Sequence, residues 1–230
     1  MLPYAVPRRA VLIFANDAKT DLARRAFPTA ILPLLTGPKV EGVAADAHFF
    51  TRSLGAADDK RNVHQQIGRN FAERFENALE TIRSLGYEQI VAVGRDCPSL
   101  CARDISFAFE QLETHRIVLG PDHRGGCYLI ASRTEELHLL RGIRWEKNTD
   151  CEQLQNRCRA EEVLLLPVKH DLDSWADLAI LARGSDWIAQ FASSLLEFVP
   201  VAGDVARSFV DLARQFVRVR GQMPPPAFVG

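Results

Sequence analysis

The chain has 230 residues, of which 47% are hydrophobic, so one large domain, or one domain with an appendage, can bury a sizeable core. The formal net charge of -1 excludes the global positive field typical of nucleic-acid-binding proteins. No apolar run approaches the roughly 18 residues that a membrane span needs, and the N-terminus lacks a secretory signal. With five cysteines, an odd number, and no CxxC pair, we expect a cytoplasmic protein with reduced thiols, no nucleic-acid partner and no transmembrane segment.

The first predicted element is a buried strand over residues 10–15, where the sequence AVLIFA is wholly apolar. The loop after it carries Lys19 and Thr20, at the place where nucleotide-binding sheets commonly grip phosphate. A helical pattern follows over residues 22–35, and two prolines within it predict two short pieces.

Residues 40–50 are predicted to form a second strand, and the polar stretch 51–61 an exposed loop. Residues 62–85 predict one long helix that ends at Gly86. Its apolar face belongs to the core rather than to a cofactor site, and consists of Ile67, Phe71, Phe75, Ala78, Leu79 and Ile82.

The stretch 89–128 organises the rest of the chain. Residues 90–93 predict a buried strand that ends at Gly94 and delivers Asp96 to the edge where open α/β sheets bind ligands. A helix follows, then a strand over residues 116–119 that Gly120 and Pro121 are expected to break.

A further strand over residues 127–131 follows Gly125 and Gly126. A carboxylate at one strand end and paired glycines at another predict a pocket for phosphate and metal. The same features also occur as a capped corner and a tight turn, so both interpretations stay open.

After the central stretch, residues 134–140 and 151–160 predict helices and residues 163–167 a strand. The irregular segment 142–145 is expected to close over the site. Another helix is expected to begin at Asp173 or Ser174 and to run to residue 183.

From residue 185 the chain becomes an amphipathic helical hairpin with a proline-rich tail. The hairpin is expected to pack on its own domain, to form a homodimer or to lie on a membrane surface. We therefore divide the chain into residues 1–184 and 185–230. Alternating strands and helices predict an α/β fold with a doubly wound, mostly parallel sheet and helices on both faces.

Four motifs stand in order along the chain: VAVGRDCPSL, VLGPDHRGGCYLIAS, GIRW and DLDSWADL. Together they resemble the bacterial glycosyltransferase-A-like family, formerly a domain of unknown function and of the selenium- or arsenosugar-associated transferase type. The resemblance covers residues 10–183. It implies the nucleotide-diphospho-sugar transferase fold, whose members include sugar-nucleotide glycosyltransferases and nucleotidyltransferases.

The resemblance also implies roles for particular residues. Asp96 matches the aspartate expected to hold Mg²⁺ or Mn²⁺ against the phosphates of the donor. Lys19, beside Thr20, falls near the basic residue of the first loop of the family. Asp171 and Asp173 match the late acidic motif, and either would complete the metal shell or orient an acceptor hydroxyl.

Two departures from the family pattern bear on activity. The first loop is shortened and has Asp21 where the family has arginine. Arg124 replaces the acid that precedes Gly125 and Gly126, so a fixed positive charge could contact phosphate directly.

The favoured hypothesis is a transferase that moves a sugar from a nucleotide sugar to a small-molecule acceptor. A nucleotidyltransferase on the same fold is the first alternative. A degenerate, non-catalytic binding or scaffold subunit is the second.

Overall fold

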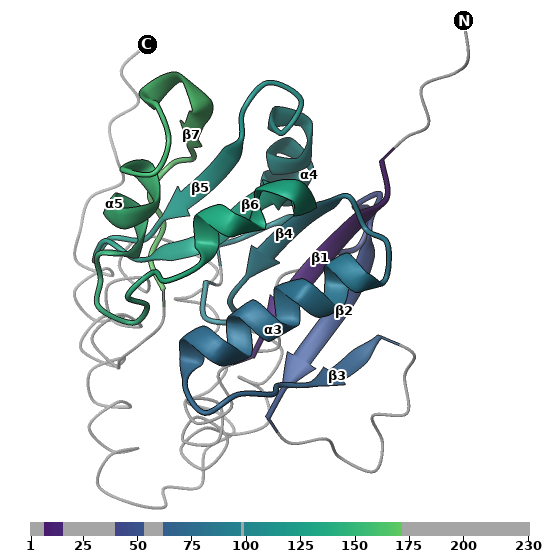
Figure 1. Cartoon of the computed structure of the whole chain (residues 1–230). Coiled ribbons are helices and arrows are strands. Elements are labelled where there is room, and N and C mark those ends of the chain that lie inside the picture. The colour runs from purple at the N-terminus through teal and green to yellow at the C-terminus, as the bar shows by residue number, and fades with distance from the viewer. Residues whose placement is uncertain (1–6, 16–39, 53–61, 98, 172–230) are drawn as a thin grey trace, which may run out of the picture. The chain divides into compact units, whose positions relative to one another are not determined.

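The computed structural model describes residues 7–15, 40–52, 62–97 and 99–171, all of which belong to one compact unit. One sheet of seven strands runs through it in the order β3-β2-β1-β4-β6-β5-β7 (Figure 1). All paired strands are parallel except that β6 is antiparallel to both neighbours. The strands are β1 (Arg9–Phe14), β2 (Asp46–Thr51), β3 (Val63–Gln65), β4 (Gln89–Val93), β5 (Ile117–Pro121), β6 (Cys127–Arg133) and β7 (Val163–Leu165).

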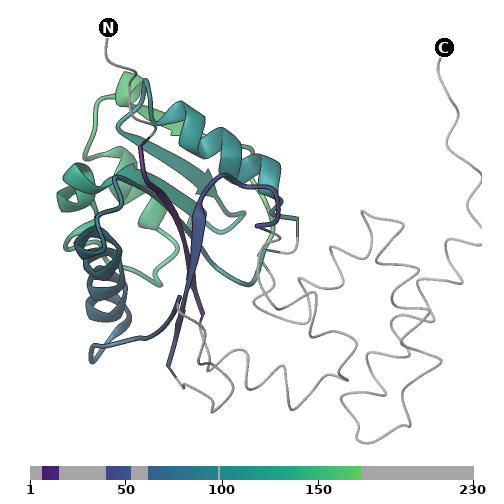
Figure 2. The ribbon, with the colours of Figure 1, turned by 90° about the vertical axis from the view of Figure 1, so that its right-hand side faces the viewer.

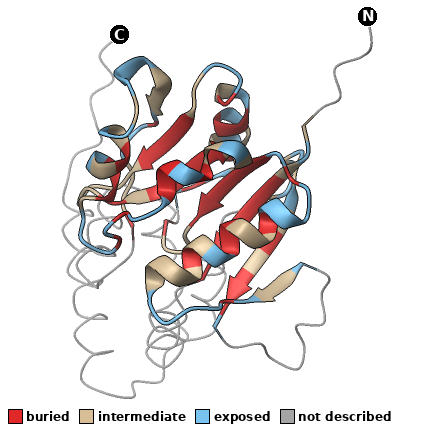
Figure 3. Cartoon of the chain, in the orientation of Figure 1, coloured by how far each residue is buried: buried red, intermediate tan, exposed pale blue. Residues whose placement is uncertain are grey.

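Helices cover both faces of this sheet. The helix α3 (Phe71–Ser84) lies on one face and α4 (Ala102–Gln111) on the other (Figure 2). Along β1, Leu12 packs with the α3 cluster and Val11 with the α4 cluster, as the two-residue period of a strand requires. The central strands are therefore buried on both sides (Figure 3). The predicted fold class, a doubly wound and mostly parallel α/β sheet, is confirmed.

The remaining described helices are short and lie after β6: η1 (Thr134–Leu140), α5 (Asp150–Gln155) and η2 (Ala160–Glu162). The short helix predicted over 134–140 is thus a 3₁₀ helix. The helix predicted over 151–160 begins at Asp150 but ends earlier, at Gln155.

The prediction of a single helix over residues 62–85 is wrong for the residues before Phe71. Val63–Gln65 instead forms β3, which pairs with the end of β2. Gly68, at φ 143, separates that strand from the helix. Asn70 is the N-cap, because its side-chain oxygen accepts a 2.9 Å hydrogen bond from the backbone N–H of Glu73. Ile67, expected in the core, is 68% exposed.

Several strand boundaries also differ from the prediction, and those of β2 and β5 have a local reason. β2 begins at Asp46 rather than at residue 40, because Gly42 at φ 84 turns the preceding segment. β5 runs through Gly120 and Pro121 instead of ending there, but its register with β6 shifts between these two residues. The ring of Tyr128 on β6 covers Gly120, where an added Cβ would lie 2.5 Å from the ring carbon Cζ. The glycine therefore admits the neighbouring ring rather than ending the strand.

Trp145 does not close over the site, contrary to expectation. Its side chain is 9% exposed and belongs to the α3 core cluster. The indole meets Phe75 edge to face with ring centroids 5.1 Å apart. The segment 142–145 is thus fixed to the core by this side chain.

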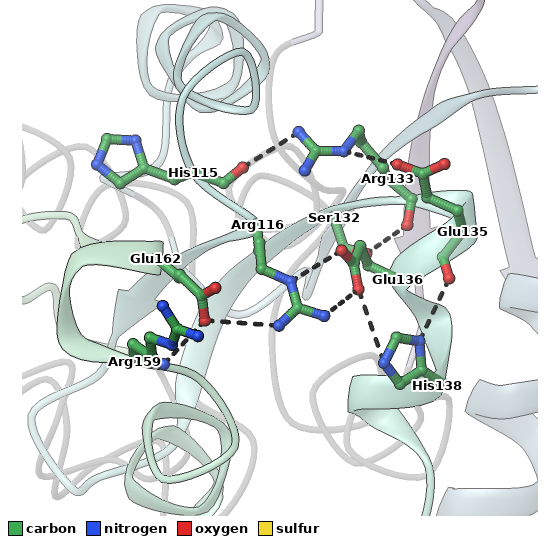
Figure 4. Close-up of polar contacts among 9 residues, drawn as sticks. All are labelled: His115, Arg116, Ser132, Arg133, Glu135, Glu136, His138, Arg159 and Glu162. Atoms are coloured by element: carbon green, nitrogen blue, oxygen red, sulfur yellow. Dashed lines mark hydrogen bonds and ion pairs between the residues drawn. The ribbon is translucent and has the colours of Figure 1, made fainter.

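The edge where the parallel strands begin, which we call the amino edge, is held by paired charges (Figure 4). Arg116, just before β5, donates to both carboxylate oxygens of Glu136, with Nε–Oε1 2.8 Å and Nη2–Oε2 2.6 Å. Its Nη1 lies 3.5 Å from Glu162 Oε2, just before β7. The hydrogen bond from Arg116 lowers the pKa of Glu136. These contacts join η1, the start of β5 and η2, which are three separate segments of the sequence.

Several predicted elements lie outside the described residues. They are the helix over 22–35, most of the loop over 51–61, the helix that begins at Asp173 or Ser174, and the segment 185–230 with its domain boundary. Within the described part of the chain, no helix has the length and apolarity to cross a membrane.

Candidate functional site

The opposite edge, which we call the carboxyl edge, collects four chain segments. β1, β4, β5 and β7 run in the same direction, so they all end at this edge. β6 is reversed and therefore begins there. The loops that follow β4 and β5 and the segment that follows β7 thus converge, as the position of Asp96 in the sequence predicts.

Asp96 lies three residues past the end of β4 and is half-buried. Its side chain folds back over the turn, because a Cβ added to Gly94 would lie 2.5 Å from Asp96 Oδ1. Gly94 therefore makes room for the carboxylate at the rim of the sheet. This is a structural reason for the Gly-x-Asp spacing.

Asp171 approaches the same corner from the end of β7. It is 8% exposed. The pKa of the Cys97 thiol is raised to about 12. Burial is the largest cause, and the nearby Asp171 carboxylate, which accepts a hydrogen bond from the thiol, is the next. Because Cys97 is the residue after Asp96, the β4 loop and the β7 tail are in contact. The structure thus brings together the two acidic segments that are separated by more than 70 positions in the sequence.

Gly125 and Gly126 serve close packing within the protein. Gly125 has φ +99, and an added Cβ would lie 2.4 Å from the carbonyl oxygen of Asn148. A Cβ on Gly126 would lie 2.4 Å from Asp122 Oδ2. The N–H of Gly126 donates to Asp122 Oδ1 at 3.0 Å, so this donor is used within the protein. The hydrogen bond therefore does not support the prediction that the turn binds phosphate.

Arg124 lies in this turn, half-buried at the carboxyl edge. Its backbone N–H donates to Asp122 Oδ1 at 2.6 Å. Asp122 is therefore the residue that caps the turn, two positions before the place where the family has its acid. A contact between the Arg124 side chain and a phosphate stays a prediction.

Asp150 is a second buried acid at this turn, directly before the helix predicted over residues 151–160. It is 9% exposed, and burial, then the negative charge of Asp122, raises its pKa to about 6. An added Cβ on Gly126 would lie 3.6 Å from Asp150 Oδ2. The loop before it is strained, with Glu146 at φ 61 and Asn148 at φ 56. The raised pKa and the strain are signals that only the folded chain reveals.

The three cysteines nearest the predicted pocket differ in their environments. Cys97 is buried and Cys127 is half-buried, as expected for packing residues. Cys101 is exposed and is the N-cap of α4, where its backbone N–H donates to Asp104 Oδ2 at 2.9 Å. The packing interpretation is thus correct for Cys97 and wrong for Cys101.

Not every predicted site residue can be placed. Lys19, Thr20 and Asp173 lie outside the described residues. Among the residues that are described, no group of three or more His, Cys, Asp or Glu side chains has a metal-binding arrangement. Of the predicted acids, Asp96 and Asp171 are described, and Asp171 lies against Cys97, the residue after Asp96.

A match to a known protein family shows which family the chain belongs to. A family model described as "Uncharacterized protein conserved in bacteria (DUF2064)" matches residues 10–147. The chain belongs to this family. The match includes β1 to β6, the Asp96 corner and the turn with Gly125 and Gly126, and it confirms the family resemblance; three of the four motifs lie within it, and DLDSWADL lies beyond it. No protein of curated function matches the chain.

Several solved structures share the fold of this chain. A candidate nucleotide-diphospho-sugar transferase from Desulfovibrio desulfuricans G20 is 24% identical, with a TM-score of 0.64, and the likeness covers 92% of this chain and 99% of that one. A cytidylyltransferase from Leptospira borgpetersenii serovar Hardjo-bovis is 12% identical, with a TM-score of 0.52 over 98% and 100% of the two chains. Rv0371c from Mycobacterium tuberculosis H37Rv is 13% identical, with a TM-score of 0.52 over 79% and 100%. At these identities the likeness shows the fold of the nucleotide-diphospho-sugar transferases, and the chemistry must be argued from the site.

Proposed function

We propose that this protein is a transferase that uses a nucleotide-activated substrate, and that it moves a sugar from a nucleoside diphosphate to a small acceptor. The observation that carries the proposal is the meeting of the Asp96 corner and the Asp171 segment at the carboxyl edge. Ligands of open α/β sheets bind at this edge. The fold shared with sugar-nucleotide and cytidylyl transferases supports a nucleotide as the activating group.

The residues present fit a hard divalent cation, Mg²⁺ or Mn²⁺. Gly94 leaves a space that the Asp96 carboxylate occupies, and Asp171 lies against Cys97, the next residue in the same loop. Carboxylate oxygens are the ligands that such ions prefer, and donor phosphates would supply more. When bound, the cation would offset the charge of the departing nucleoside diphosphate.

The other predicted residues would divide the remaining work, as the family resemblance implies. Lys19, Thr20 and Arg124 would contact the phosphates, where fixed positive charge stabilises the leaving group. Gly125 and Gly126 would keep the turn tight, so that Arg124 stays at the rim. Asp173 would face the acceptor and orient its hydroxyl.

A thermal-unfolding screen tests the proposal. Nucleoside diphosphate sugars and nucleoside triphosphates are each added with and without Mn²⁺, because a ligand that binds only the folded state raises its melting temperature. We expect a nucleotide sugar to stabilise the wild type in a Mn²⁺-dependent way and to stabilise Asp96→Asn much less. No stabilisation by any nucleotide would contradict the proposal and favour a binding or scaffold subunit.

Nucleotidyl transfer is the second candidate function, because the cytidylyltransferase shares the fold over nearly the whole of both chains. Release of pyrophosphate from a nucleoside triphosphate, instead of release of a nucleoside diphosphate, would identify it. The shortened first loop weighs against a triphosphate, which needs more positive charge than a diphosphate.

A further inference from the structure

Lys169 extends the sheet beyond β7. Its backbone N–H donates to the carbonyl oxygen of Pro121 at 3.2 Å, and its own carbonyl accepts from the N–H of His123 at 3.1 Å. A parallel bridge therefore pairs Asp122 with Lys169 past the last regular pair of β5 and β7. The backbone of the β7 tail is fixed to the turn that follows β5.

The side chain of Lys169 reaches the other side of the carboxyl edge. Its Nζ donates to the carbonyl oxygen of Ser99 at 2.8 Å and to Asp104 Oδ2 at 2.6 Å. The side chains of Lys169 and Asp104 are only 15% and 20% exposed, so this ion pair is screened less than a surface pair. Ser99 lies in the loop that carries Asp96, and Asp104 lies in the first turn of α4.

Asp104 is itself fixed in place. The oxygen that accepts from Lys169 also accepts from the backbone N–H of Cys101 at 2.9 Å. Lys169 therefore joins three elements: the tail of β7, the loop after β4 and the start of α4. Two of its three N–H donors are used in these contacts, which favours an anchoring role over phosphate binding.

We propose that Lys169 is a positioning residue that holds the β4 loop, which carries Asp96, at a fixed separation from the β7 tail, which carries Asp171. The proposal rests on the proposed function, because the separation matters only if both carboxylates hold one cation. Lys169 is two residues from Asp171 on one segment, and its partner Ser99 is three residues from Asp96 on the other.

The test measures Mn²⁺ affinity, from the electron paramagnetic resonance signal of the free ion, together with thermal unfolding. Lys169→Met is expected to weaken Mn²⁺ binding about 10- to 100-fold, the range typical when a residue that orients metal ligands is lost. Lys169→Arg retains the charge and is expected to recover most of the affinity. Asp104→Asn and the double variant should weaken binding no further than Lys169→Met alone, since both break one contact.

Arg116→Met is the matched control, because it removes an ion pair at the amino edge. It should lower the melting temperature and leave Mn²⁺ affinity unchanged. If Lys169→Met loses stability but binds Mn²⁺ like the wild type, Lys169 is only structural and the inference is wrong. If the wild type and Asp96→Asn bind Mn²⁺ equally, the proposed metal site itself is wrong and both proposals fail.

Discussion

The two edges of the sheet use charge in opposite ways. At the amino edge Arg116 lies between Glu136 and Glu162, and each acid near it has its pKa lowered. At the carboxyl edge Lys169 pairs with Asp104, but Asp150 lies near a second acid, and burial, then the charge of Asp122, raise its pKa. Paired charges stabilise a fold, whereas like charges held together are characteristic of binding and catalytic sites. The amino edge thus maintains the structure, and the carboxyl edge is where the proposed chemistry would take place.

The largest effect should come from removing a carboxylate of the carboxyl edge. Asp96→Asn is expected to lower turnover about 100- to 1,000-fold, because the neutral amide is a poor ligand for a hard cation. The melting temperature should change little. Initial rates of nucleoside diphosphate release measure the first effect, and calorimetry the second. Glu113→Gln, an exposed position after α4, is the control; equal rates for Asp96→Asn and wild type would remove the metal role of Asp96.

The amino edge should show the reverse pattern. Arg116→Met leaves Glu136 and Glu162 without their shared cation, so the urea midpoint should fall while turnover per folded molecule stays constant. The loss should be smaller than that of Leu119→Ala, a fully buried truncation expected to cost about 2–5 kcal/mol. A drop in turnover at temperatures far below unfolding would contradict the division between the two edges.

Asp150 allows a pH test of strain at the carboxyl edge. Its pKa of about 6 in the folded protein exceeds its ordinary value of 3.8. Its contribution to stability is therefore fully present below pH 3.8 and is lost as pH rises through about 6. Asp150→Asn should raise the free energy of unfolding at pH 7 by on the order of 1 kcal/mol, after allowance for solvent screening. Chemical denaturation across this range measures it; the same pH dependence in both proteins would show that Asp150 is not strained.

The smallest effect, with the opposite sign, is expected from His48 and His64. Their ring nitrogens lie 3.0 Å apart, and His48 also contacts the hydroxyl of Tyr87 at 2.9 Å. Burial lowers the pKa of both histidines below 6.5, so the unfolded chain takes up protons first as the pH falls. Stability should therefore fall as the pH drops below about 6.5, by less than the ceiling of about 1.4 kcal/mol per pH unit per group. His64→Gln should flatten this slope in denaturation curves, and an unchanged slope would contradict the assignment.

Much of the fold follows from local sequence patterns. The apolar runs of β1, β4 and β6 and the alternation of strands and helices were sufficient to predict the sheet. β3 was missed because Val63–Gln65 is short and its strand character comes from pairing with β2, a tertiary contact. The helix boundary depended on a single cap, Asn70, inside a pattern that was helical on both sides.

The site was predictable only in part. Asp96 follows from a strand that ends in Gly-x-Asp, and the meeting with Asp171 follows from the rule for parallel strands. The packing of Gly125 and Gly126 against Asn148 and Asp122 depends on distances that no spacing in the sequence encodes. Lys169 was missed for the same reason, because its partner Asp104 is 65 positions away.

The reversed strand β6 has an implication for how this scaffold can change. Since β6 begins where β5 ends, the rim receives the short turn 122–126 without an intervening helix. The length and the charge of such a turn can change between relatives without a change in the seven-stranded sheet. The replacement of an acid by Arg124 would then change which substrate binds at the turn while the sheet stays the same.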